Sequence, residues 1–109
     1  MDNFKKAISN IIEFLNEIDD GAYFVQIGFL YELQDLIDHE KYDLFYERIN
    51  SVEMWGGSGA LWESEYGMTV IQRKQFDILL LNLLSELAFN GKASKRAKAI
   101  YKALRKQSD

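Results

Sequence analysis

The 109-residue sequence has no cysteine and only one histidine, His39. Without cysteine, the chain forms no disulfide bond and offers no thiolate to a substrate or a metal ion. A single histidine cannot supply a histidine-rich metal site, and the sequence offers no serine triad built around it. We therefore expect His39 to be an ordinary residue at a helix end, and we expect no catalytic residue, no metal and no cofactor.

Proline and long hydrophobic runs are also missing. Average usage would give about five prolines in this length, and proline interrupts helices, so its absence permits helices almost anywhere. The longest apolar stretches, 21–31 and 78–84, contain Gln26 and Asn82. They fall far short of the roughly 20 residues that span a bilayer. The first residues have none of the features of a signal peptide. We therefore expect a cytoplasmic protein with no membrane partner.

The composition that remains is that of a globular protein. Hydrophobic residues make up 48% of the chain and charged residues 28%, which is typical of one folded domain with one core. Apolar residues recur at three- and four-residue spacing, the pattern of amphipathic helices. The expected helices cover about 3–19, 22–39, 41–50, 72–90 and 93–106. The sequence thus predicts an all-α fold, a single-domain bundle of about five helices over residues 1–109.

Local patterns refine this bundle. The first half of the helix 22–39, residues 23–30, is apolar nearly all round, which predicts burial in the centre, and the leucine-rich helix 72–90 is the expected central helix. The short connection near residue 40 favours an antiparallel pair of helices. Gly21 and Gly91 stand where a left-handed residue commonly ends a helix.

A glycine-rich segment, 54–62, interrupts the helical pattern and contains three glycines and both tryptophans. Glycine loses much backbone freedom in a helix, so this segment is expected to be a loop. Residues 61–63 and 68–71 could pair as a short hairpin before the fourth helix. We expect Trp55 in the core, whereas Trp62 suits the core and a binding surface equally well.

Charge is distributed unevenly along the chain. Residues 1–91 contain 16 acidic and 6 basic side chains, whereas residues 92–109 contain 7 basic side chains and 1 acidic side chain. The fifth expected helix, 93–106, makes up most of this basic segment. Such a helix can pack beside acidic helices and offset their repulsion, or it can contact a polyanion. We favour packing, because the acidic remainder of the chain would repel nucleic acid.

The acidic side chains include a set spaced at three residues, which places its members roughly on one helix face. Two interpretations stay open for this set: a solvated face, or an acidic patch that docks a basic partner. The predicted partner-binding residues are Glu32, Asp35, Asp38, Asp43, Glu47, Trp62 and Glu63. The second candidate is the acidic cluster of the first helix, which contains Glu13, Glu17, Asp19 and Asp20.

The loop Met54-Trp55-Gly56-Gly57-Ser58-Gly59-Ala60-Leu61 and the leucine-rich segment 76–87 resemble a family of small bacterial proteins. Members share a W/F-G-G-x-G-S-L-type loop between two helical parts, and the resemblance covers about the second half of the chain. Ala60 stands where the family pattern prefers serine, and Trp62-Glu63-Ser64 stands where the family tends to have an Asn-Asp pair. The family in turn resembles immunity proteins of polymorphic toxin systems, and it carries over no catalytic residue.

This resemblance implies a protein that neutralises a cognate antibacterial toxin by direct binding. Many toxins are basic because they attack nucleic acid, so an acidic helical domain suits such a partner. The alternative is a helical adaptor or a regulatory subunit of another complex, and a homo-oligomer is compatible with either function. A nucleic-acid-binding protein is the less favoured third class, and an enzyme is the last.

Overall fold

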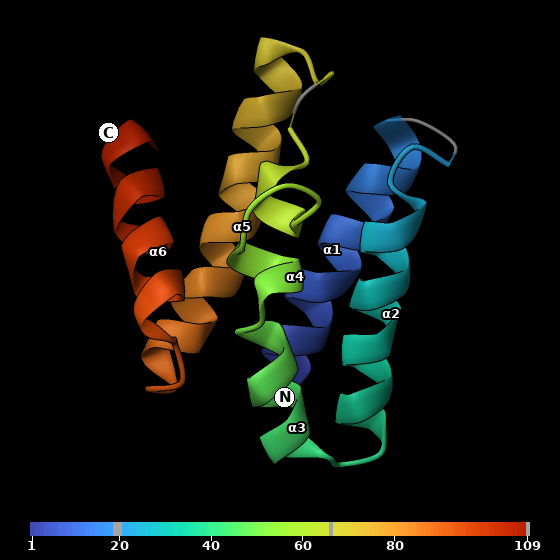
Figure 1. The fold of residues 1–109 in the computed structure, drawn as a ribbon, viewed down its shortest axis with the longest axis vertical. Coiled ribbons are helices and arrows are strands. Elements are labelled where there is room, and N and C mark those ends of the chain that lie inside the picture. Colours follow the sequence, from blue (N-terminus) through green and yellow to red (C-terminus); the bar gives the residue numbers. More distant parts are fainter. Residues whose placement is uncertain (19–20, 66, 109) are drawn as a thin grey trace.

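The computed structural model describes residues 1–18, 21–65 and 67–108, which form helices joined by short turns (Figure 1). The elements are α1 (Asp2–Ile18), α2 (Phe24–Asp38), α3 (Tyr42–Ile49), α4 (Val52–Trp55), the 3₁₀ turn η1 (Leu61–Glu63), α5 (Val70–Phe89) and α6 (Lys95–Ser108). Five of these are helices of eight residues or more, and the described residues contain no strand. The predicted all-α bundle of about five helices is confirmed, with α4 and η1 as additional short turns. Among the described residues, no helix combines the length and hydrophobicity that a bilayer crossing requires.

The four longest helices lie side by side in one layer, in the spatial order α2, α1, α5, α6 (Figure 1). α3, α4 and η1 lie across one side of this layer. α2 and α3 pack against each other and run in opposite directions, as the short connection predicts. Glu40 in that connection adopts a left-handed conformation, with φ of 56°. The order of the helices places α2 at one edge of the layer and α6 at the other.

The core is built mainly between α1 and α5. The fully buried or nearly buried side chains of these two helices are Phe4, Ile8, Ile11, Ile12, Leu15, Phe76, Leu80, Leu83, Leu84 and Leu87. α5 packs between α1 and α6, so the leucine-rich helix is central, as predicted. At its C-terminal end the chain turns at Gly91, whose φ is +67° and which therefore has the expected left-handed conformation.

The predicted short hairpin before α5 is wrong. Residues 61–63 form η1, and α5 begins at Val70, so it includes Val70 and Ile71 of the second expected strand. The cause is a capping box at Thr69. The Thr69 hydroxyl accepts the Gln72 backbone N–H at 3.1 Å, and the Gln72 side chain accepts the Thr69 backbone N–H at 2.9 Å. These two bonds satisfy N–H groups at the helix start and favour helix over strand there.

The predicted burial of the first half of α2 on all sides is also wrong. Phe24 and Val25 are 77% and 72% exposed, whereas Leu30 and Leu33 are fully buried. α2 packs against α1 and α3 only on one side because it lies at the edge of the layer. Its opposite side therefore faces solvent despite its apolar sequence.

The predicted loop over 54–62 is only partly correct, because Met54 and Trp55 end α4 and Leu61 and Trp62 belong to η1. The irregular part covers 56–60, and this glycine-rich segment packs against the bundle through Trp55. This side chain is fully buried, as predicted, and its indole N–H donates to the backbone carbonyl of Ile49 at 2.8 Å. Gly56, the next residue, lies so close to the preceding turn that a Cβ atom there would be 2.6 Å from the Val52 carbonyl oxygen. Gly59 has φ of +89°, which glycine adopts without strain.

The basic helix α6 packs within the domain. Ala97, Ile100 and Leu104 are buried, and Tyr101 is half-buried. Its neighbours are α5 and α4, whereas the acidic helix α2 lies at the opposite edge of the layer. The prediction that α6 packs in the domain is therefore confirmed, but α6 does not lie beside α2 to offset its charge.

Candidate functional site

Three carboxylates of α2 lie on its exposed side, toward the C-terminal end of the helix. Glu32, Asp35 and Asp38 line a shallow hollow of about 440 Å³ together with Tyr31 and Gln34. Their three-residue spacing thus places them on one face, as the sequence predicts.

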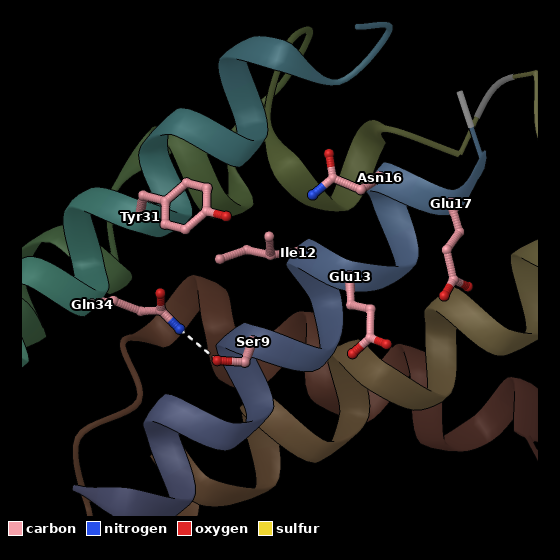
Figure 2. A pocket seen from close by; sticks show the side chains of 7 residues that line it. All are labelled: Ser9, Ile12, Glu13, Asn16, Glu17, Tyr31 and Gln34. Atoms are coloured by element: carbon pink, nitrogen blue, oxygen red, sulfur yellow. Dashed lines mark hydrogen bonds between the residues drawn. The ribbon is translucent and has the colours of Figure 1, made fainter. Parts of the chain in front are cut away.

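The hollow continues into a groove between α1 and α2, which Figure 2 shows from close by. Tyr31 and Gln34 line both the hollow and the groove, whose volume is about 410 Å³. The Gln34 amide donates to the Ser9 hydroxyl at 2.7 Å, which joins the two helices. On the α1 side the groove is lined by Ser9, Ile12, Glu13, Asn16 and Glu17.

Tyr31 is the aromatic side chain of this groove. It is 55% exposed and extends from α2 toward Ile12 of α1, which is only 6% exposed (Figure 2). A tyrosine in this position offers an apolar ring and a polar hydroxyl to a partner. Tyrosine is also one of the residues that contribute most to protein–protein binding.

Glu13 and Glu17 stand on the exposed side of α1. Besides the groove beside α2, they line a second groove of about 350 Å³ between α1 and α5, where they meet Gln75 and Ile78. The two acidic clusters of the sequence therefore lie on adjacent helices. Asp19 and Asp20, which belong to the same predicted cluster, lie outside the described residues. We define the acidic face as Glu13, Glu17, Glu32, Asp35 and Asp38.

Two carboxylates of the acidic face form ion pairs with bases of neighbouring helices. Asp38 pairs with Lys5 of α1, and Glu32 pairs with Arg48 of α3. The hydrogen bond to Asp38 and the charge of that carboxylate raise the pKa of the Lys5 ammonium above its ordinary value. All four side chains are well exposed, so each pair contributes little to stability.

The other three carboxylates, Glu13, Glu17 and Asp35, form no ion pair with any described residue. Glu13 and Glu17 line the groove that contains Tyr31, and Asp35 lines the adjoining hollow, which Tyr31 also borders. Negative charges gathered in this way produce a local potential that attracts a positively charged partner and speeds its association.

The predicted site residues of α3 lie apart from the groove lining. Asp43 and Glu47 are exposed on the side of α3 opposite the buried Phe45. They are four residues apart and therefore share one face of α3.

The predicted site residues of the loop are also separate from the acidic face. Trp62 is half-buried: its indole N–H donates to the Gly56 carbonyl at 3.2 Å, and the Arg96 guanidinium lies 5.8 Å from its ring centroid. Glu63 lines a small hollow at the first residues of α2, beside Tyr23. α2 has 15 residues and rises about 1.5 Å per residue, so about 20 Å separate this end of the helix from Asp38. The structure thus brings together three of the seven predicted residues.

The exposed apolar residues of α2 were not among the predicted site residues: Phe24 and Val25 were expected to be buried, and Tyr31 was not singled out. Phe24, Val25 and Tyr31 are all exposed, and Gly28 lies among them on the helix surface. The sequence feature that could have indicated this surface is Gly28. A glycine inside a helix destabilises it relative to alanine, so its presence there suggests a role in packing or binding.

Histidine and carboxylate side chains among the described residues do not gather into a metal-binding group. No group of three or more histidine, aspartate or glutamate side chains among them is arranged to hold a metal ion. His39 lies at the C-terminal end of α2, where its ring Nδ1 is 2.8 Å from the Asp35 backbone carbonyl oxygen.

The chain matches no protein-family model, no curated protein sequence and no solved structure.

Proposed function

We propose that the protein is an immunity protein that binds a cognate antibacterial toxin directly and blocks it without catalysing a reaction. The observation that carries the proposal is the grouping of Glu13, Glu17 and Asp35 around the exposed ring of Tyr31. Unpaired carboxylates and an exposed aromatic ring suit a basic protein surface. The resemblance of the glycine-rich loop to a family similar to immunity proteins supports the same kind of partner.

The acidic face would neutralise such a toxin by covering its basic surface. A toxin that attacks nucleic acid holds the phosphate backbone with lysine and arginine side chains. A complementary acidic surface associates with those side chains rapidly and excludes the substrate. The proposed place of action is the cytoplasm, where the nucleic acid of the protected cell lies.

The proposed binding residues differ from those that the sequence alone suggested. Asp35 is kept and is joined by Glu13, Glu17 and Tyr31. Glu32 and Asp38 are also part of the acidic face, but their charges are shared with Arg48 and Lys5. Trp62, Glu63, Asp43 and Glu47 lie outside it and serve as comparison positions.

The test uses the toxin encoded by the reading frame next to the gene, coexpressed with variants of the protein. Glu13→Lys combined with Asp35→Lys reverses one unpaired charge on the groove and one on the adjoining hollow. Asp43→Lys combined with Glu47→Lys makes the same change in net charge on α3 and is the matched control. We expect the first variant to lose protection and to associate with the toxin at least about tenfold more slowly, and the control to behave as the parent.

Two results would contradict the proposal. A neighbouring gene product that is not toxic, or that the parent protein does not neutralise, would remove immunity as the function. Full protection by the groove variant, with an unchanged association rate, would remove the acidic face as the binding surface. Circular dichroism of each variant confirms that the fold is retained.

A further inference from the structure

The exposed side of α2 carries an apolar ridge with a gap in it. Phe24, Val25 and Tyr31 are 77%, 72% and 55% exposed, and Gly28 lies between them. Residues three and four positions apart are neighbours on a helix surface, so Gly28 is surrounded by Phe24, Val25, Tyr31 and the carboxylate of Glu32. The result is a depression whose floor is backbone and whose walls are three apolar side chains and one acidic side chain.

The fold itself gives no reason for glycine at position 28. A Cβ atom added there would have no heavy atom within 4 Å, and the backbone is that of a regular helix. Gly56 shows the contrast, because a Cβ atom there would collide with the Val52 carbonyl oxygen. An alanine at position 28 would fit and would stabilise α2, since glycine is the poorer helix former. Gly28 therefore permits a close approach from outside the chain.

The charges around the ridge indicate the chemistry of what approaches. Toward the C-terminal end of α2 lie Glu32, Asp35 and Asp38, and across the groove lie Glu13 and Glu17. Lys5 and Arg48 pair with two of these carboxylates and leave three unpaired. The ridge is thus bordered by net negative charge, which fits a positively charged partner.

We infer that the depression at Gly28 binds a basic amphipathic helix of a partner protein. This helix packs against α2 with a short distance between the two helix axes. The distance between two packed helices depends on the side chains at their contact, so a glycine at that point allows the closest approach. Phe24 and Tyr31 then lie on either side of the incoming helix as aromatic anchors, about 10 Å apart along α2. Lysine or arginine side chains of the partner helix reach Asp35, Glu13 and Glu17. This inference rests on the proposed function in one respect, that the partner is basic. It adds that the partner binds through an α-helix.

The test uses a defined probe: a fluorescein-labelled helical peptide composed of lysine, alanine and leucine, with a control peptide in which every lysine is glutamate. The protein variant is Gly28→Leu, which fills the depression and, as a better helix former, should not lower the thermal midpoint of unfolding. Ala99→Leu makes a similar addition on the exposed side of α6 and is the matched control. A second variant, Tyr31→Ala, removes one anchor.

We expect the lysine peptide to bind the parent protein and Ala99→Leu equally, and to shift the backbone amide resonances of α2. Gly28→Leu and Tyr31→Ala should each weaken this binding by about tenfold or more. The glutamate peptide should not bind. Unchanged binding by Gly28→Leu, or resonance shifts confined to another helix, would overturn the inference. Concentration-dependent dimerisation of the parent that Gly28→Leu abolishes would overturn it too, because the ridge would then bind a second copy of the chain.

The outcomes separate this inference from the proposed function. Suppose that Gly28→Leu binds the peptide as the parent does, while Glu13→Lys combined with Asp35→Lys loses protection. The immunity function then stands, and the inferred helix-binding site at Gly28 is wrong. If the peptide binds at Gly28 but the neighbouring gene product is not toxic, the surface stands and its natural partner is a different basic protein.

Discussion

The Nε of Arg96 donates a hydrogen bond to the backbone carbonyl of Trp55 at 2.9 Å. The same guanidinium lies 5.8 Å from the ring centroid of Trp62. One side chain of the basic helix α6 therefore joins that helix to both tryptophans of the glycine-rich loop. Sequence alone would count Arg96 among the charges available to a polyanion, whereas the structure gives it a role inside the domain.

Arg96→Met should therefore destabilise the protein, because it removes the hydrogen bond and the cation–π contact while keeping an apolar side chain of similar length. We expect a loss of about 1–2 kcal/mol in the free energy of unfolding, measured by urea denaturation. Lys98→Met on the same helix should change it by less than about 0.5 kcal/mol. Equal effects of the two substitutions would show that the contact to Trp55 contributes nothing measurable.

Leu104 anchors the C-terminal half of α6. It is 4% exposed, and it borders a groove of about 270 Å³ with Ile78 and Leu81 of α5. Leu104→Ala should lower the free energy of unfolding by about 2–5 kcal/mol, since it removes buried methyl groups and leaves a cavity. Lys102→Ala on the exposed side of α6 is the control. If Leu104→Ala unfolds at the same urea concentration as the parent, α6 is not packed as the structure shows.

Gly56 and Gly57 are adjacent in sequence but differ in their surroundings. A Cβ atom at Gly56 would lie 2.6 Å from the Val52 carbonyl oxygen, whereas a Cβ atom at Gly57 would have nothing within 4 Å. Gly56→Ala should therefore force the turn after α4 to move and cost about 1–3 kcal/mol. Gly57→Ala should be close to neutral or slightly stabilising, because alanine restricts the unfolded chain. Thermal unfolding of the two variants compares them directly.

Helical periodicity predicts most of this fold. The spacing of Phe4, Ile8 and Leu15 identifies the buried face of α1, because the opposite side of α1 faces solvent and carries polar residues such as Glu13 and Glu17. Periodicity does not predict the exposure of Phe24 and Val25. Their exposure depends on the position of α2 at the edge of the layer, which is a property of the tertiary arrangement and not of the local sequence.

The candidate site is predicted only in part for a related reason. Three-residue spacing places Glu32, Asp35 and Asp38 on one face, since that relation lies within a single helix. The proximity of Glu13 to Tyr31 arises from the packing of α1 against α2, so it cannot be predicted from the local sequence of either helix. The loop residue Trp62 suggested a binding surface because tryptophan is common in interfaces, but its N–H and its ring already have partners within the chain.

Two carboxyls near the start of α5, Glu65 and Asp77, should contribute less to stability as pH rises through the mildly acidic range. Burial raises the pKa of Glu65 above 4.5, and the charge of Asp77 raises it further. Burial likewise raises the pKa of Asp77 above 3.8, although Arg73 opposes the shift. The folded state thus holds these protons more tightly than the unfolded state, so their contribution is present below the unfolded pKa values and is lost as pH rises through the folded ones.

Asp77→Asn removes one of the two charges and lets the new amide donate to Glu65. Because both side chains are partly exposed, we expect a gain of at most about 1 kcal/mol at neutral pH and a shallower decline above pH 4.5. Thermal midpoints measured in steps from acidic to neutral pH provide the test, and Asp43→Asn on the exposed side of α3 is the control. An Asp77→Asn profile parallel to that of the parent would mean that the two carboxyls do not interact in the folded protein. A lower midpoint at neutral pH would mean that the Asp77 carboxylate stabilises the start of α5 through Arg73 more than its burial beside Glu65 costs.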